Sequence, residues 1–145
     1  MDTIGDILDE KGSEVVAIVP EATVLSAVET MCARHIGALL VATAEATLGI
    51  ISERDVLTRV ILERRDPAKT LVKQVMTHAV VCVRPSTKVR EAMAVMTERR
   101  CRHLPVVAER AIIGIVSIGD LVRHASHEQE FEIRMLTEYV QGGYV

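Results

Sequence analysis

The sequence repeats itself, and this repeat limits the possible folds more than any other feature. When the 145-residue sequence is shifted by 65 positions, residues 15–60 align with residues 80–125 without a gap. The identical pairs with the most distinctive residue types are Pro20 and Pro85, Gly49 and Gly114, Ser52 and Ser117, and Asp55 and Asp120. A repeat of this size is one supersecondary unit that cannot bury its apolar face alone, so we expect the two copies to pack on each other.

Each copy is predicted to form a strand, a helix, two more strands and a second helix. A β-branched run ended by proline, apolar residues at helical spacing and two short apolar runs follow in the same order in both copies. The predicted strands are 15–19, 38–42 and 48–51 in the first copy and 80–83, 104–107 and 113–116 in the second, with helices at 24–31 and 89–96. The pattern predicts an α/β (α+β) fold in which two β-α-β-β-α repeats pack about a pseudo-two-fold axis.

A short lead-in before each copy is repeated as well. Residues 4–8 resemble residues 72–76 at a shift of 68, so the first copy has three extra residues within positions 9–14. We therefore predict three parts: 1–65, the first repeat with its N-terminal lead-in helix; 66–125, the second repeat with its lead-in helix; and 126–145, a helical tail. In the tail, Phe131, Met135 and Tyr139 recur at helical spacing, which predicts an amphipathic helix that packs on its own module or on a partner.

Composition argues against several classes of function. Aromatic residues make up only 2% of the chain and the formal net charge is −3, which disfavours base stacking and a basic surface for nucleic acid. No apolar run is long enough to span a membrane, and none follows a basic start as in a signal peptide. The three cysteines are an odd number at scattered spacing, so we expect no disulfide framework and a reducing, cytoplasmic location.

The residues that suggest chemistry lie where the third predicted strand of each copy meets the following helix. These junctions read Gly49-x-x-Ser52-x-x-Asp55 and Gly114-x-x-Ser117-x-x-Asp120. Free backbone N–H groups at a helix start favour an anion, and a carboxylate in the first turn can accept two hydrogen bonds from a cis-diol such as a ribose. Serine followed by an acidic residue is also ordinary helix capping. Capping does not require a glycine three residues before the serine, so the recurrence of all three residues favours a ligand site.

The doubled motif resembles a pair of CBS (cystathionine β-synthase) domains over residues 3–125. The Pro-x-x-x-Val-x-x-Ala pattern upstream and the Arg-His-Leu-Pro-Val-Val strand at 102–107 add to the likeness. A CBS pair, or Bateman module, is a regulatory unit that binds adenosine-containing ligands in two clefts between its repeats. The resemblance implies a protein that is not an enzyme, has no catalytic cofactor and senses AMP, ADP, ATP, S-adenosylmethionine or NAD(H). It also implies signalling through conformation or assembly to an unknown effector protein, a homodimer, and no contact with nucleic acid or membrane.

The resemblance assigns site residues as well, because each cleft combines the motif of one repeat with the first strand, helix and second strand of the other. Asp55 and Asp120 are expected to bind ribose hydroxyls, and Ser52 and Ser117 to contact phosphate or ribose. The Asp55 cleft is expected to use Arg54, Thr87, Ala92, Arg102 and His103, and the Asp120 cleft Ala22 or Thr23, Ala27, Gly37 and Ala38. The small Ala27 and Ala92 are expected to leave room for an adenine. With up to three cationic groups, the Asp55 cleft is expected to be the better anion site.

Two alternatives remain open. A constitutive dimeric interaction module with vestigial clefts would have the same sequence pattern. A metal or redox protein is the other, because Cys32 and His35 lie at i, i+3 on one predicted helix, and Cys101 and His103 lie on one face of a strand. A nucleophilic enzyme is not expected, since neither motif serine has a histidine partner at a position shared by both copies.

Overall fold

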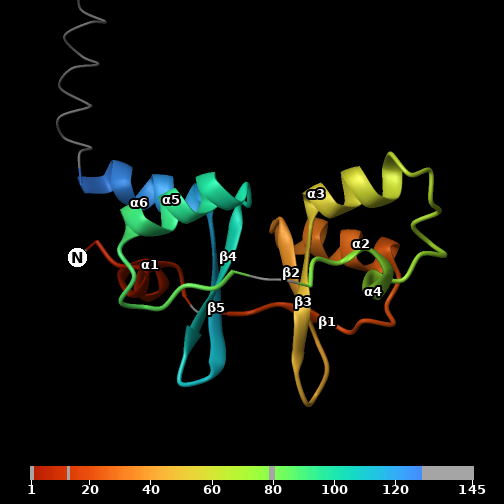
Figure 1. The fold of residues 1–145 in the computed structure, drawn as a ribbon, viewed down its shortest axis with the longest axis horizontal. Helices are drawn as coiled ribbons and strands as arrows, with labels where there is room; N and C mark the ends of the chain where they lie inside the picture. The colour runs from red at the N-terminus through yellow and green to blue at the C-terminus, as the bar shows by residue number, and fades with distance from the viewer. Residues whose placement is uncertain (1, 13, 79–80, 129–145) are drawn as a thin grey trace, which may run out of the picture. The chain divides into compact units, whose positions relative to one another are not determined.

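The computed structural model describes residues 2–12, 14–78 and 81–128. The chain divides into two compact units, and Figure 1 shows the elements of each. The first-repeat unit is the continuous segment Glu14–Val81, whereas the second-repeat unit combines Met1–Ser13 with Cys82–Val145. The second-repeat unit is therefore assembled from two segments that are far apart in the sequence.

The first-repeat unit contains a three-stranded sheet in the order β1-β2-β3. Strand β1 runs parallel to β2, and β3 runs antiparallel to it. The elements are β1 (Ala17–Ile18), α2 (Val24–Arg34), β2 (Ala38–Ala42), β3 (Thr47–Ser52), α3 (Glu53–Val56), the π-helix η1 (Leu57–Ile61) and α4 (Val72–Val75). Helix α2 is the crossover that two adjacent parallel strands require.

The core of this unit includes apolar residues of the helix predicted at 24–31 and of the strands predicted at 38–42 and 48–51. Thr23 begins α2, since its hydroxyl oxygen accepts a hydrogen bond from the backbone N–H of Ser26 at 3.1 Å. The helix ends at His35, whose left-handed backbone (φ 55°) stops the hydrogen-bond ladder. The buried side chains are Val24, Ala27 and Met31 from α2, Leu39, Val41 and Ile51 from the sheet, and Val60, Val72, Val75 and Met76.

The second-repeat unit has the antiparallel pair β4 (His103–Ala108) and β5 (Ala111–Ser117), with helices α1 (Ile4–Lys11), α5 (Val89–Arg99) and α6 (Ile118–Glu128). Val83 forms a parallel bridge with Val106, in the place that β1 holds in the first-repeat unit. Helix α1 packs against both β5 and α6 (Figure 1). The same order of elements therefore occurs twice, which confirms the predicted fold class of two β-α-β-β-α repeats.

The two lead-in helices are exchanged between the repeats. In the first-repeat unit, the backbone N–H groups of Val72 and Lys73 at the start of α4 donate to the carbonyls of Ala22 (2.8 Å) and Pro20 (3.0 Å). In the second-repeat unit, Ile4 and Gly5 at the start of α1 donate to the carbonyls of Thr87 and Pro85, each at 2.9 Å. Helix-start N–H groups have no partner within their own helix, and these carbonyls supply one.

Because of this exchange, the compact units differ from the predicted ranges 1–65 and 66–125. Those ranges attach each lead-in to the repeat that follows it along the chain, whereas α1 packs with the second repeat and α4 with the first. The predicted strands at 38–42, 48–51, 104–107 and 113–116 are confirmed. The predicted strand at 80–83 is reduced to the Val83 bridge among its described residues. The predicted tail helix with Phe131, Met135 and Tyr139 lies outside the described residues.

Candidate functional site

The first motif forms a capping box at the start of α3. Ser52 donates to Oδ2 of Asp55 from both its backbone N–H (2.9 Å) and its hydroxyl (3.1 Å), and the backbone N–H of Asp55 donates to Ser52 Oγ at 3.4 Å. These bonds satisfy N–H groups that a helix start leaves without partners. The helix-capping interpretation of Ser52 and Asp55 is therefore correct for this structure, whatever further role the two residues have.

The second oxygen of Asp55 is also engaged within the first-repeat unit. Oδ1 accepts a hydrogen bond from the hydroxyl of Thr77 at 3.1 Å and lies 3.9 Å from Nε of Arg59. The exposed fraction of Asp55 is only 7%. Arg59 in turn donates to the carbonyls of Val75 (3.1 Å) and Met76 (2.9 Å), so it connects η1 to the end of α4. A buried carboxylate needs such partners, and Asp55 has them without a ligand.

The glycine of each motif has a packing function. A Cβ atom at Gly49 would meet the backbone carbonyl oxygen of Thr77, and one at Gly114 would lie 2.8 Å from a methyl carbon of Leu8. Thr77 follows α4 and Leu8 lies in α1, so both glycines make room for the exchanged lead-in. Their recurrence therefore has a structural cause, and it carries less weight for a ligand site than the sequence suggested.

The second motif has a different set of partners. The backbone N–H of Ser117 donates to Asp120 Oδ2 at 2.8 Å, and the backbone N–H of Asp120 donates to Ser117 Oγ at 3.1 Å. Nζ of Lys11 lies 2.7 Å from the same Oδ2, and Nη1 of Arg123 lies 3.5 Å from Oδ1. Burial acts to raise the pKa of Asp120, but the hydrogen bond from Lys11 and those from Ser117 outweigh it and hold that pKa below its usual range.

The strand register places other predicted site residues beside the motif of their own unit. Ala38 is paired with Ser52, and the carbonyl of Gly37 accepts the N–H of Glu53 at 3.0 Å. His103 is paired with Ser117, and the carbonyl of Arg102 accepts the N–H of Ile118 at 2.8 Å. Sequence reasoning assigned each of these pairs to the cleft of the opposite motif, and that assignment stays a prediction.

The remaining predicted site residues serve structural purposes within their units. Ala27 and Ala92 have an exposed fraction of 0%, so an adenine at either position would require neighbouring residues to move. Thr23 caps α2, while the carbonyls of Ala22 and Thr87 accept hydrogen bonds from the exchanged lead-ins. Arg54 lies in α3, and its backbone carbonyl accepts the hydroxyl of Thr58 at 2.8 Å.

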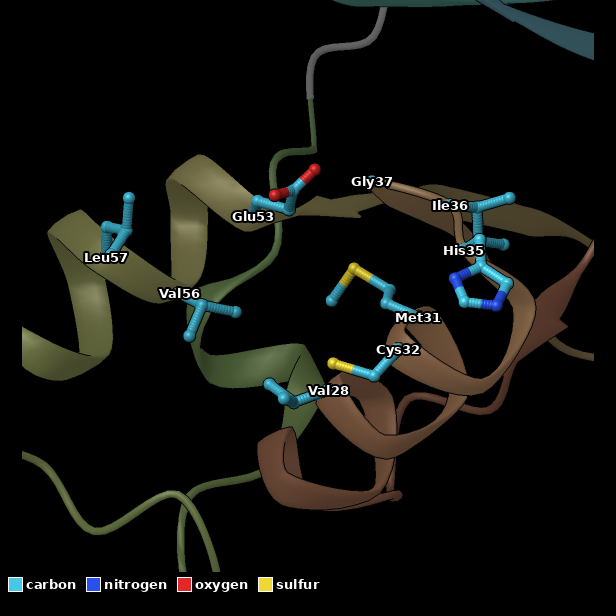
Figure 2. A pocket seen from close by; sticks show the side chains of 9 residues that line it. All are labelled: Val28, Met31, Cys32, His35, Ile36, Gly37, Glu53, Val56 and Leu57. Atoms are coloured by element: carbon cyan, nitrogen blue, oxygen red, sulfur yellow. The ribbon is translucent and has the colours of Figure 1, made fainter.

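A pocket of about 580 Å³ lies between α2 and α3 in the first-repeat unit. Figure 2 shows Val28, Met31 and Cys32 of α2 on one side and Glu53 and Val56 of α3 on the other. The rest of its wall is His35, Ile36, Gly37 and Leu57. Gly37 is the one predicted ligand residue in this wall, so the pocket largely misses the predicted nucleotide site.

The metal alternative finds no supporting cluster in the described part of the chain. There, no group of three or more histidine, cysteine or acidic residues is placed to hold a metal ion. Cys32 and His35 belong to the first-repeat unit, and Cys101 and His103 belong to the second. Burial raises the pKa of the Cys101 thiol, which disfavours the thiolate that zinc would need.

Sequence reasoning missed four residues that contact the motif carboxylates: Thr77, Arg59, Lys11 and Arg123. Thr77 and Lys11 lie beyond the matched lead-in segments 72–76 and 4–8, so the repeat gave no signal for them. Arg59 lies four residues after Asp55 in the sequence. Its i, i+4 spacing from Asp55 was the signal that could have found it.

Comparisons with known proteins agree with this architecture. The family model described as CBS domain matches residues 4–62 and 72–127. The chain belongs to the CBS-domain family. It is a tandem CBS pair, a regulatory module of a kind that generally binds adenosine-containing ligands.

Individual relatives and solved structures are similar to this CBS pair over most of its length. CBS domain-containing protein CBSX3, mitochondrial, from Arabidopsis thaliana is 40% identical over 151 residues, which cover 98% of this chain and 73% of the relative. The solved structure of a protein with CBS domains from Burkholderia ambifaria MC40-6 is 39% identical with a TM-score of 0.85, covering 88% of this chain and 96% of that one. A hexameric CBS-CP12 protein from bloom-forming cyanobacteria is 25% identical with a TM-score of 0.77, covering 97% and 81%. Within the described residues, no helix is long and apolar enough to cross a membrane.

Proposed function

We propose that this CBS pair is a regulatory sensor of adenosine-containing ligands, with AMP, ADP, ATP and NAD(H) as the expected class and S-adenosylmethionine as a further candidate. The observation that carries the proposal is the pair of carboxylates, Asp55 and Asp120, each fixed by a serine at a strand-to-helix junction. A fixed carboxylate with two acceptor oxygens suits a ribose diol. Membership of a family that generally binds adenosine ligands supports this use of the two sites.

Ligand binding at Asp55 would replace hydroxyl donors of the chain by hydroxyl donors of the ligand. The hydroxyls of Ser52 and Thr77 now donate to its two oxygens, and two ribose hydroxyls would replace them. The exchange keeps the buried carboxylate hydrogen-bonded, so it avoids the penalty of leaving it without partners. The released Thr77 follows α4, and its displacement is a route by which occupancy would reach the rest of the unit.

Calorimetry with AMP, ATP, NAD(H), S-adenosylmethionine and adenosine tests the proposal directly. We expect at least one ligand to bind, and we expect Asp55→Ala and Asp120→Ala each to weaken binding at its own site by tenfold or more, since both diol bonds to a charged acceptor are lost. Asp9→Ala is the matched control, because Asp9 is an exposed acidic residue outside both motifs. Thermal unfolding of each variant checks that the fold survives.

A complete lack of response to this panel would overturn the sensor proposal and leave the second candidate, a constitutive interaction module. The specific observation that favours this candidate is that both motif carboxylates already have internal partners. In either case we propose that the chain is not itself an enzyme, has no catalytic cofactor and acts on another polypeptide. Self-association, expected as a homodimer, is supported by the hexameric assembly named for the cyanobacterial CBS-CP12 protein.

A further inference from the structure

Lys11 lies at the second motif although it comes from the opposite end of the sequence. Its ammonium group donates to Asp120 Oδ2 at 2.7 Å and to the backbone carbonyl of Ile115 at 2.8 Å. All three residues belong to the second-repeat unit. Helix α1 holds the lysine there, because Leu8 of the same helix packs under Gly114 of β5. The contact is therefore part of the packing of α1 and is not a chance meeting of two long side chains.

The first motif has no equivalent lysine. Residues 74–83 follow the start of the second lead-in and contain neither lysine nor arginine. Asp55 receives a neutral hydroxyl from Thr77 instead, and its described ion pair is with Arg59 at 3.9 Å, whose guanidinium already donates to two carbonyls. Asp120 has Lys11 at 2.7 Å and Arg123 at 3.5 Å. The two motifs therefore share a carboxylate but differ in the charge beside it.

We infer that Lys11 makes the Asp120 site selective for adenosine ligands that carry phosphate. The inference deepens the proposed function and rests on it. A lone aspartate that binds a ribose diol also repels the phosphate attached to the same ribose. An ammonium group held at that aspartate cancels the repulsion, and it carries rotatable bonds that let it turn toward the phosphate. The side chain of Lys11 is 35% exposed, so it is accessible to a ligand.

The expected size of the effect follows from the charge alone. A phosphate on a ribose held at Asp120 lies within roughly 8 Å of the lysine, and at an effective dielectric constant between about 20 and 80 one charge then changes affinity on the order of tenfold. Neutral adenosine should hardly respond to this charge. S-adenosylmethionine, with a net positive charge, should respond in the opposite direction.

The test is calorimetry with AMP, ATP, adenosine and S-adenosylmethionine on the full chain and on its Lys11→Met variant. Both proteins are also measured with Asp55→Ala added, so that the binding that remains is binding at the Asp120 site. We expect Lys11→Met to lower the affinity for AMP and ATP about tenfold, while the affinity for adenosine changes less than twofold. We expect Lys11→Arg to restore the affinity for AMP. Lys73→Met, which removes an exposed lysine from α4, is the matched control for net charge.

Each other outcome has a distinct meaning. If Lys11→Met tightens AMP and adenosine equally, the lysine only occupies the carboxylate and the inference is wrong. An unchanged ratio between the affinities for AMP and adenosine would also overturn the inference. If the unaltered chain binds none of the four ligands, the proposed function itself fails. Should the methionine variant not fold, Lys11→Gln removes the charge, keeps a hydrogen-bond donor for Asp120 and answers the same question.

Discussion

At the scale of single residues, the glycine of each motif recurs as the sequence showed, but the reason for its recurrence is packing. The sequence predicted that Ser52 begins a helix and that Asp55 lies in its first turn, and both are observed. Gly49 was taken as support for a ligand because capping does not need it. The structure shows that a Cβ atom at position 49 would collide with the backbone of Thr77, so the glycine makes room for that segment. Contacts between segments distant in sequence leave no local pattern, so this cause was not predictable.

Gly49→Ala is predicted to destabilise the first-repeat unit by about 1–3 kcal/mol, since the new methyl group would meet a backbone carbonyl that cannot rotate away. Gly119→Ala is the matched control, because a Cβ at Gly119 lies 3.6 Å from Ser117 Oγ and makes an ordinary contact in α6. There the change should be neutral or slightly stabilising. Urea unfolding of both variants measures the difference, and equal stability for the two would refute the packing role of Gly49.

At the scale of elements, periodicity predicted most strands and helices, but it could not assign the lead-ins. Helices α1 and α4 resemble each other, so either could pack on either repeat as far as residue types show. In the structure each lead-in is held at the segment before α2 or α5, where Pro20 and Pro85 accept hydrogen bonds from the exchanged lead-in. The same exchange brings Lys11 to Asp120, a cation that sequence reasoning did not place at this motif.

The ion pair that joins α1 to α6 predicts a specific pH dependence. The pKa of Asp120 is lowered in the folded chain, so the stability it contributes is present above the unfolded value near 3.8 and is lost as pH falls through the folded pKa. Lys11→Met should reduce the free energy of unfolding by about 1 kcal/mol at pH 7. The difference between this variant and the unaltered chain should shrink as pH falls below 3.8, as measured by denaturant unfolding. A difference that does not shrink at any pH below 3.8 at which the chain still folds would contradict the ion pair.

At the scale of the whole molecule, the described surface has apolar side chains that neither unit buries. Leu57, Ile61 and Leu62 in and after η1 are 60%, 53% and 75% exposed. Val122, which aligns with Leu57 in the repeat, is 48% exposed on α6. Exposed apolar groups that recur at equivalent positions favour a contact surface over chance exposure. This supports the proposed self-association, whose sequence basis in the tail lies outside the described residues.

Leu57→Asp is predicted to shift the chain from a dimer toward the monomer, because a charge at this position would have to be desolvated in the contact. Multi-angle light scattering after gel filtration measures the mass directly. Val19→Asp is the control, since Val19 is 54% exposed but lies before the Pro20 turn and not in η1. If Leu57→Asp leaves the mass unchanged, the surface formed by Leu57, Ile61 and Leu62 is not the contact.

The exchange of lead-ins also sets an order of events during synthesis on the ribosome. All residues of the first-repeat unit are contiguous, so this unit can complete its core while the rest of the chain is still being made. Helix α1 is made before the first-repeat unit but must wait for its partners, since Asp120, which pairs with Lys11, is 109 residues away. Closing so long a loop is slow compared with local folding. Helix α1, which precedes both repeats, is thus among the last elements to reach its place, and it completes the second-repeat unit only when α6 has been made.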